Sequence, residues 1–182
     1  TFPVVTKGKL AGIFGTRPTV AQLPPGVQDT LRTTPLSGSA IAPLPTRMPT
    51  GSASSVRMAP AADGESVESM FAGMERGVAI LGGVRLSMEP GLGHGLAIPQ
   101  HCFEVKDGKL TRQILGAGMQ FSTLKAWQGV DALGGAATVQ TSLASTQAGS
   151  PAVFSLIQTT APAVQFRGVG LIDLEASLGI GG

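Results

Sequence analysis

Hydrophobic and polar residues alternate most clearly between Phe103 and Ile114, on both sides of the pair Asp107-Gly108. Phe103 and Val105 alternate with charged residues before the pair, and Leu110 and Ile114 continue the same two-residue period after it. An Asp-Gly pair between two such runs is typical of a type I′ turn. The pattern therefore predicts a β-hairpin, whose residues include no nucleophile, metal-ligand set or phosphate-binding loop.

A second hairpin is predicted from Val4 to Phe14, where apolar residues flank a Lys7-Gly8-Lys9 turn. Its sequence Val-Thr-Lys-Gly-Lys-Leu is similar to Val-Lys-Asp-Gly-Lys-Leu in the first hairpin. Six residues are too few to establish a duplication. Whether the two hairpins pair in one sheet stays open at this point.

Two segments show the spacing of an amphipathic helix. From Asp63 to Arg76, four apolar residues fall at i, i+3, i+4 and i+7, acidic residues occupy the first turn, and Gly77 follows as a left-handed stop. The four are Val67, Met70, Phe71 and Met74. The second segment runs from Met119 to about Gln128. Its apolar side consists of Phe121, Leu124 and Trp127. We expect two helices, over about 63–76 and 119–128.

The pair Gly82-Gly83 interrupts a continuous strand pattern. Val78–Leu81 precedes it and the alternating run Val84–Glu89 follows it. Two glycines inside a strand indicate a β-bulge or the close approach of another backbone. Further strands are predicted at 96–103, 151–157, 163–166 and 168–177, and 130–148 is interpreted as a loop.

Prolines and glycines break up the segment from Arg17 to Pro60, where they forbid a long helix or a central strand. Apolar residues such as Leu31 and Ile41 make the segment too hydrophobic for a free linker. We interpret 17–60 as an extended Pro-rich arm packed over a neighbour. The whole chain, 1–182, is predicted to be a single α+β domain, mainly antiparallel β-sheet with hairpins and two helices.

Composition narrows the range of partners. Only 13% of the residues are charged, so the surface has little charge to keep molecules apart, and we expect a partner chain to cover part of it. The net charge is +2, and the basic residues before Asp63 are scattered without interleaved aromatic residues. Nucleic-acid-binding surfaces cluster such charges. Because the sequence also lacks an apolar run of about eighteen residues, we expect neither nucleic acid nor a membrane as a partner, and a cytoplasmic location.

The histidines and the cysteine do not make up a metal site. A zinc site needs three side-chain ligands from the protein, whereas the only histidines are His94 and His101. Cys102 follows His101, and adjacent strand residues point to opposite faces of a sheet. A single cysteine also cannot form an internal disulfide. We predict no metal ligands and no catalytic residues in this chain.

Thr1 suggests a different class of enzyme. A chain that begins with Thr can be an N-terminal nucleophile hydrolase, in which the free α-amine acts as the base for the threonine hydroxyl. Lys7 and Lys9 lie close enough in sequence to tune that amine, but both also flank the predicted turn. The Thr1 hydrolase is kept as an alternative.

Five landmarks, in their order and spacing, resemble the C-terminal half of the TldD/PmbA family. They are Thr46–Pro49, the helix end Met74–Val78, Gly82-Gly83 with the strand after it, Lys106–Arg112 leading to Gly116-Ala117, and Gly179–Gly182. The segment Val5–Ile13 also looks like the family's strand of the form Ile-Glu-Asn-Gly-x-Leu-x-Gly. Members are called modulators of DNA gyrase, and are zinc metallopeptidases or their non-catalytic partners.

The resemblance implies one of two situations: either the chain is the C-terminal part of a cut or split protein whose catalytic histidines lie elsewhere, or it belongs to the PmbA-like branch, which has lost the metal. The family's catalytic half carries a His-Glu-x-x-x-His helix upstream of the region matched here, and a cysteine in the last part of active members completes the zinc site. This sequence has neither that motif nor a cysteine after Cys102, so no ligand is carried over. The chain is thus expected to be non-catalytic alone, with zinc in an associated catalytic half or partner if the assembly is active.

By the same resemblance, the partner is a homologous or catalytic TldD-type subunit in a homo- or heterodimer that encloses a cleft for unfolded or flexible peptides. A β-rich domain can hold such a peptide by strand addition, which contacts the peptide backbone. We assign this substrate-binding role to Arg47, Gly82, Gly83, Val84 and Arg85, for which a purely internal packing role also stays open.

The sequence is therefore interpreted as the C-terminal structural and substrate-cleft domain of a metallopeptidase assembly. Besides the Thr1 hydrolase, the alternative is a non-proteolytic binding or regulatory protein of the gyrase-modulator type.

Overall fold

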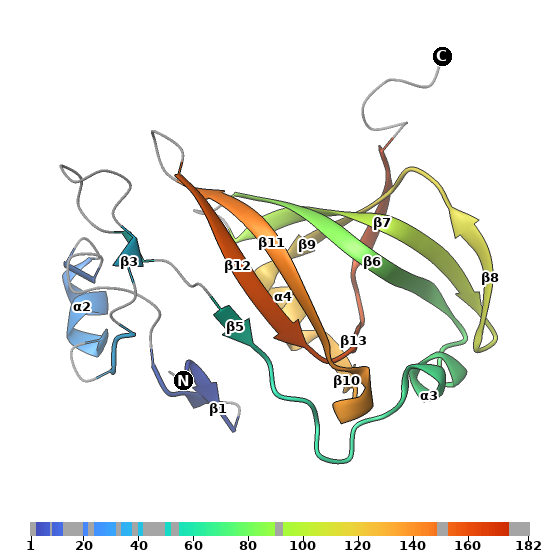
Figure 1. The fold of residues 1–182 in the computed structure, drawn as a ribbon, viewed down its shortest axis with the longest axis horizontal. Helices are drawn as coiled ribbons and strands as arrows, with labels where there is room; N and C mark the ends of the chain where they lie inside the picture. The colour runs from blue at the N-terminus through green and yellow to red at the C-terminus, as the bar shows by residue number, and fades with distance from the viewer. Residues whose placement is uncertain are drawn as a thin grey trace. The chain divides into compact units, whose positions relative to one another are not determined.

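A computed structural model of the chain is shown in Figure 1. It describes residues 3–7, 9–12, 20–21, 24–31, 34–37, 40–41, 50–51, 55–89, 93–148 and 153–174. Contacts divide the chain into two compact units, Thr1–Arg57 with Thr141–Thr160, and Met58–Gln140 with Ala161–Gly182. We call these the first and the second unit. Strands dominate both and the helices are short, which confirms the predicted α+β class.

The first unit contains short strands and one helix. β1 (Val5–Thr6) and β2 (Lys9–Leu10) form the predicted N-terminal hairpin, with Lys7 at φ 50° in its turn. They make a two-stranded sheet of their own, so the two similar hairpins do not pair. The remaining elements are α2 (Pro25–Leu31), the pair β3 (Ala40–Ile41) and β4 (Thr50–Gly51), and a sheet of β11 (Gln140–Ala148), β12 (Val153–Ala161) and β5 (Ser55–Arg57).

The extended arm predicted over 17–60 and the single domain over 1–182 stay predictions. Within the described part of the arm, the chain forms α2 and the short strands β3, β4 and β5.

The second unit is organised around β7 (His94–Lys106). β6 (Arg76–Glu89) pairs with one side of β7 along its length, while β9 (Ala117–Ser122) and β8 (Lys109–Ile114) share the other side. β14 (Gly170–Asp173) pairs with β9, and all these pairs are antiparallel. A separate pair is made by β10 (Val130–Leu133) and β13 (Val164–Phe166).

The hairpin of β7 and β8 confirms the clearest sequence prediction. Lys106 pairs with Lys109, which leaves Asp107 and Gly108 as the two turn residues, at φ 50° and 74°. Positive φ at both positions is the requirement of a type I′ turn. The turn lies against the end of α3 (Val67–Ala72), because the amides of Asp107 and Gly108 donate to Glu75 and Met74 carbonyls at 2.8 and 2.9 Å.

Both predicted helices are shorter than expected. The first, predicted over 63–76, is α3, which begins after the N-cap Ser66 and ends at Gly73. Gly77 does not terminate it, because Gly77 lies in β6. A Cβ at Gly77 would meet the Met74 side chain, so the glycine allows Met74 to fold back over the start of the strand.

The second helix, predicted over 119–128, is wrong in its first four residues. Residues 119–122 belong to β9, where Phe121 pairs with Gly95 and Met119 with Ala97. Only α4 (Thr123–Gln128) is helical. Pairing with β7 and β14 on both sides outweighs the helical spacing of the apolar residues, an example of tertiary context overriding local pattern.

The predicted loop over 130–148 is also wrong, because it contains β10, a short 3₁₀ helix η1 (Ala136–Thr138) and β11. Gly and Ala weaken the strand pattern of this segment. The Thr138 hydroxyl fixes its turn by donating to the Gly135 carbonyl at 2.8 Å and accepting from the Ala163 amide at 3.1 Å. The strands predicted near 96–103, 151–157, 163–166 and 168–177 correspond to β7, β12, β13 and β14.

Candidate peptide-binding edge

β6 is the long edge strand of the second unit. In the strand order β14-β9-β7-β6 it comes last, and among the described residues it pairs with β7 alone. Backbone groups of alternate residues in an antiparallel strand point away from its neighbour. The outer side of β6 therefore presents N–H and C=O groups in the arrangement that an added strand needs.

The predicted bulge lies in the middle of β6. Leu81 pairs with His101 and Val84 with Pro99, so Gly82 and Gly83 together face the single residue Gln100. Gly82 has φ 83°, which favours glycine. The Gly83 amide donates to Gln100 Oε1 at 3.2 Å, so the amide freed by the bulge is bonded by the side chain across the strand.

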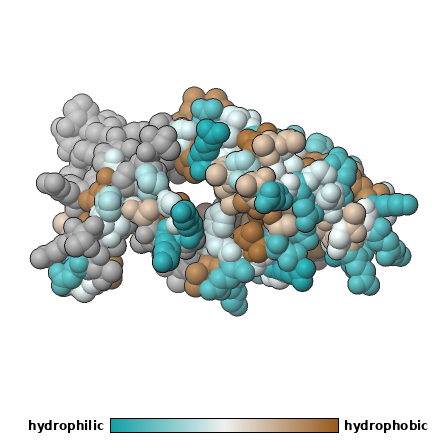
Figure 2. All heavy atoms as spheres, turned by 90° about the horizontal axis from the view of Figure 1, so that it is seen from below, coloured by the Kyte–Doolittle hydropathy of each residue, from teal (hydrophilic) through white to brown (hydrophobic). Residues whose placement is uncertain are grey.

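The bulge separates a covered half of β6 from an exposed one. Before it, Ala79 is only 5% exposed, whereas every residue from Leu81 to Glu89 is exposed. Cross-strand partners share a face of the sheet, so the register places Leu81, Val84, Leu86 and Met88 on one face. Leu86 is 59% exposed there. Figure 2 shows one side of the molecule, on which hydrophobic residues (brown) lie among hydrophilic ones (teal).

The opposite face of the exposed half is polar. The register puts Arg85, Ser87 and Glu89 on it, with Glu89 directly opposite His94 of β7. A hollow of about 490 Å³ opens at this end of the sheet. It is lined by Ser87, Met88, Glu89, His94, Gly95, Leu96, Gln120 and Ile172. A strand added to β6 would thus meet apolar side chains on one face and charged ones on the other.

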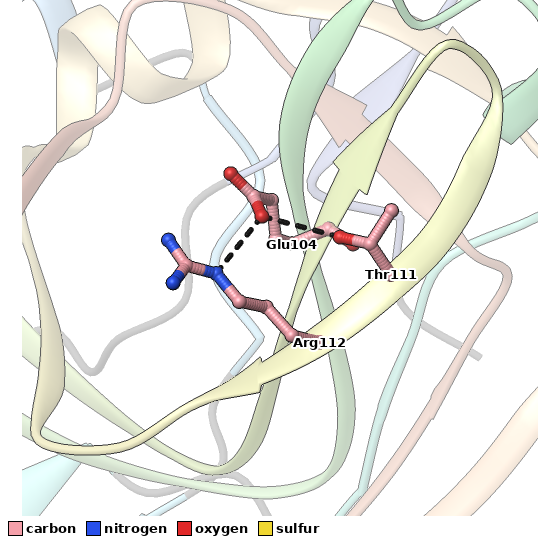
Figure 3. A network of polar contacts seen from close by, with 3 residues as sticks. All are labelled: Glu104, Thr111 and Arg112. Carbon is pink, nitrogen blue, oxygen red and sulfur yellow. Dashed lines mark hydrogen bonds and ion pairs between the residues drawn. The ribbon is translucent and has the colours of Figure 1, made fainter.

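A second bulge lies across β7, on the β8 side. Phe103 pairs with Gln113 and Val105 with Leu110, so Thr111 and Arg112 together face Glu104. Figure 3 shows both side chains reaching its carboxylate, Thr111 Oγ1 at 3.2 Å and Arg112 Nε at 3.0 Å. The bulge allows this, because adjacent residues of a regular strand point to opposite faces. The hydrogen bonds from Thr111 and Arg112 lower the pKa of Glu104.

No set of zinc ligands is formed by the described residues: no three His, Cys, Asp or Glu side chains lie together in them. His101 and Cys102 pair with Leu81 and Ile80 and so lie on opposite faces of the sheet. Cys102 is 2% exposed, and its burial raises the pKa of the thiol. A buried thiol of this kind is a packing residue, and the described residues do not fit the zinc of the family.

The predicted substrate-binding residues are only partly described. Gly82, Gly83, Val84 and Arg85 are contiguous in β6, while Arg47 lies outside the described residues. Thr1 and the landmarks 46–49 and 179–182 also lie outside them.

Sequence reasoning missed Gln100, whose place across the bulge depends on the register. It also missed Met88 and Glu89, because the strand it considered ended at Ser87. The alternation of residues 84–89 was the signal for these two, since it continues beyond Ser87.

A largely antiparallel sheet with short helices places the described part of the chain in the α+β class. The chain belongs to the family described as the PmbA/TldA metallopeptidase C-terminal domain, whose profile matches residues 2–170. This confirms the family resemblance seen in the sequence.

Two solved structures share the fold. One is a Thermotoga maritima MSB8 protein named as a modulator of a DNA gyrase, with a TM-score of 0.52 and 13% identity. The other is TldE from Thermococcus kodakarensis, with a TM-score of 0.51 and 14% identity. Each match covers 80% of this chain and 29% of the other, so the chain spans less than a third of either relative.

A comparison with curated proteins found no match. Among the described residues, no helix has the length and hydrophobicity needed to cross a membrane.

Proposed function

We propose that this chain is the structural and substrate-cleft domain of a TldD/PmbA-type metallopeptidase assembly, and that it holds an unfolded or flexible peptide as an added strand along β6. The observation that carries the proposal is the outer edge of β6, which pairs with no other described strand. Family membership supplies the context of proteolysis. The bond-breaking step is assigned to an associated catalytic half or partner subunit.

Strand addition suits a substrate without fixed sequence. Most of its hydrogen bonds go to the peptide backbone, while alternate side chains add selectivity. Here Val84, Leu86 and Met88 would contact the residues on one face of the peptide, and Arg85 would contact those on the other. The bulge at Gly82-Gly83 limits the regular edge to residues 84–89. Arg47 is retained as a proposed contact from the Pro-rich arm.

The binding mode can be tested with N-methylated peptides. A fluorescent, unstructured peptide of alternating apolar and polar residues is titrated with the protein, together with two versions that are N-methylated at odd or at even residues. An added strand uses the N–H groups of only one edge. One version should bind about tenfold or more weakly, because each of several lost hydrogen bonds contributes roughly 0.5–1.5 kcal/mol, and the other should bind normally.

Protein variants locate the same site. Leu86→Asp should weaken binding, while Leu115→Asp serves as the control, since Leu115 is 79% exposed and lies outside every strand. Equal affinity of both N-methylated peptides would contradict strand addition. Unchanged binding by Leu86→Asp would contradict the assignment to β6. Peptide binding without co-purification of any metallopeptidase subunit would favour the non-proteolytic alternative.

A further inference from the structure

The exposed half of β6 has a charge pattern that complements itself. Its sequence from Arg85 to Glu89 is basic, apolar, small and polar, apolar, acidic. An antiparallel partner strand reads this pattern in reverse, so its best complement carries a basic residue opposite Glu89 and an acidic residue opposite Arg85. The segment 85–89 itself meets this requirement. We propose that β6 of one copy pairs antiparallel with β6 of a second copy, about a two-fold axis at Ser87.

This register is selected by charge. With the axis at Ser87, Arg85 of each copy lies opposite Glu89 of the other, and the two-fold symmetry makes two such pairs. Moving the axis to Arg85 or to Glu89 would put two like charges directly opposite each other, which is unfavourable. No hydrogen bond or ion pair of Arg85 or Glu89 with another side chain occurs among the described residues.

The same register matches the apolar face. Leu86 of each copy lies opposite Met88 of the other, and both side chains are about half exposed in the single chain, at 59% and 47%. A two-fold axis perpendicular to the sheet keeps this face on the same side in both copies. The sheets of the two second units then join into one continuous sheet, and the edge of β6, which would otherwise be open to uncontrolled pairing, is closed.

The pairing has a functional consequence that rests on the proposed peptide site. The second copy and the peptide use the same N–H and C=O groups of residues 84–89. The homodimer is therefore a closed form of the site, and an extended peptide must displace the second copy to bind.

A charge-swap experiment tests the pairing through molecular mass. Sedimentation equilibrium is measured for the wild-type protein, Arg85→Glu, Glu89→Arg and an equimolar mixture of the two variants. Each variant alone places like charges in both pairs and should raise the dimer dissociation constant roughly tenfold. In the mixture, one variant is acidic at both positions and the other is basic at both, so opposite charges face each other and mixed dimers should form as readily as in the wild type. The matched control is Lys109→Glu, an exposed cation on β8, which should leave the dissociation constant unchanged.

A wild-type protein that stays monomeric at all concentrations would overturn the inference. So would variants that dimerise like the wild type, or a mixture that behaves like its separate components. These outcomes leave the peptide titration unaffected, so a failure of self-pairing is distinguishable from a failure of the proposed function. A wild-type dimer that dissociates when the alternating peptide is added would support both.

Discussion

Glu104 shows how one side chain can stabilise an irregular point of a sheet. Its side chain is 22% exposed, and its carboxylate accepts hydrogen bonds from two residues, Thr111 and Arg112, which a bulge brings to the same face. Gln100, four residues earlier on β7, does the same for the bulge at Gly82-Gly83 through a bond to a backbone amide. Each bulge of the sheet thus has a polar side chain of β7 across from it.

The pKa of Glu104 gives this contact a pH dependence. Because its folded-state pKa lies below the ordinary value of 4.5, the carboxylate adds to the free energy of unfolding above that value, and the contribution is lost as the pH falls through the folded-state pKa. Glu104→Gln should therefore be less stable than the wild type at pH 7, and the difference should shrink as the pH falls below 4.5. Urea denaturation at pH 7 and at one pH below 4.5 measures this.

The control for that experiment is Glu75→Gln, an exposed acid close to the same hairpin. Its stability should follow that of the wild type at both pH values. A constant difference between Glu104→Gln and the wild type across the pH range would show that packing, and not charge, explains the effect.

The backbone conformation of single residues could be predicted from the sequence where its cause lies in the neighbouring residues. The pair Asp107-Gly108 predicts a turn and the pair Gly82-Gly83 predicts a bulge, because few other residues adopt positive φ at low cost. The bulge at Thr111-Arg112 contains no glycine, and it exists only through its pairing with β7. Nothing in the order of residues 109–114 could reveal it, since regular alternation and a bulge differ there only in register.

The two short helices α3 and α4 differ in how the residue before their first turn stabilises them. In α3, the hydroxyl of the N-cap Ser66 accepts from the Ser69 amide at 3.2 Å. The backbone amide of Glu68, and then the Ser66 side chain, lower the pKa of the Glu68 carboxyl in the same turn. In α4, Ser122 is the N-cap residue as well, but its side chain makes no capping hydrogen bond.

This difference makes a matched pair of variants. Ser66→Ala should lower the free energy of unfolding by about 1 kcal/mol, the usual contribution of a serine cap. Ser122→Ala should change it by much less, because no capping bond is lost. Chemical denaturation followed by circular dichroism compares them. Equal losses in the two variants would refute a capping role for Ser66.

Elements were predicted well where pattern and pairing agree, as in β6 and β7. They were mispredicted where the two conflict. The apolar residues at 119–128 are spaced as in a helix, yet Phe121 packs in a strand, and Leu124, which does lie in a helix, is 68% exposed. The missed strands have weak local signals, because β10 is only four residues long and β11 is rich in Ser, Thr, Gln and Ala. Pairing with other parts of the chain outweighs these signals.

At the scale of the whole molecule, the main feature is how little apolar surface is covered. The fully or nearly buried hydrophobic residues among those described are Met70, Ala79, Ala97, Cys102 and Val105. Exposed large apolar side chains include Leu86, Leu171 and Trp127. The low fraction of charged residues predicted that a partner chain covers part of the surface. The position of β6 at the edge of its sheet indicates where a strand of such a partner would fit. The family could be predicted from the order of short motifs along the sequence. The exposed edge of β6 could be identified only from the pairing register of β6 with β7.

The division of labour in the proposed assembly can be tested by removing metal. Peptide binding by this chain should persist after dialysis against a chelator, whereas cleavage by the complete assembly should stop. Metal analysis of the purified chain should find zinc well below one equivalent. One equivalent of zinc, lost together with peptide binding on chelation, would contradict the assignment; His94→Ala and His101→Ala would then show whether these histidines hold it.

The parallel pairing of β5 with β12 affects the order in which the chain can fold. Ser55–Arg57 pairs with Gln158–Thr160, so β5 cannot pair until the chain has been synthesised as far as residue 160. The antiparallel strands from β6 to β9 follow one another directly and need only short loop closures. During synthesis on a ribosome, the strands β6 to β9 can therefore pair before β12 and β14 have emerged, and the edge of β6 is exposed at that stage.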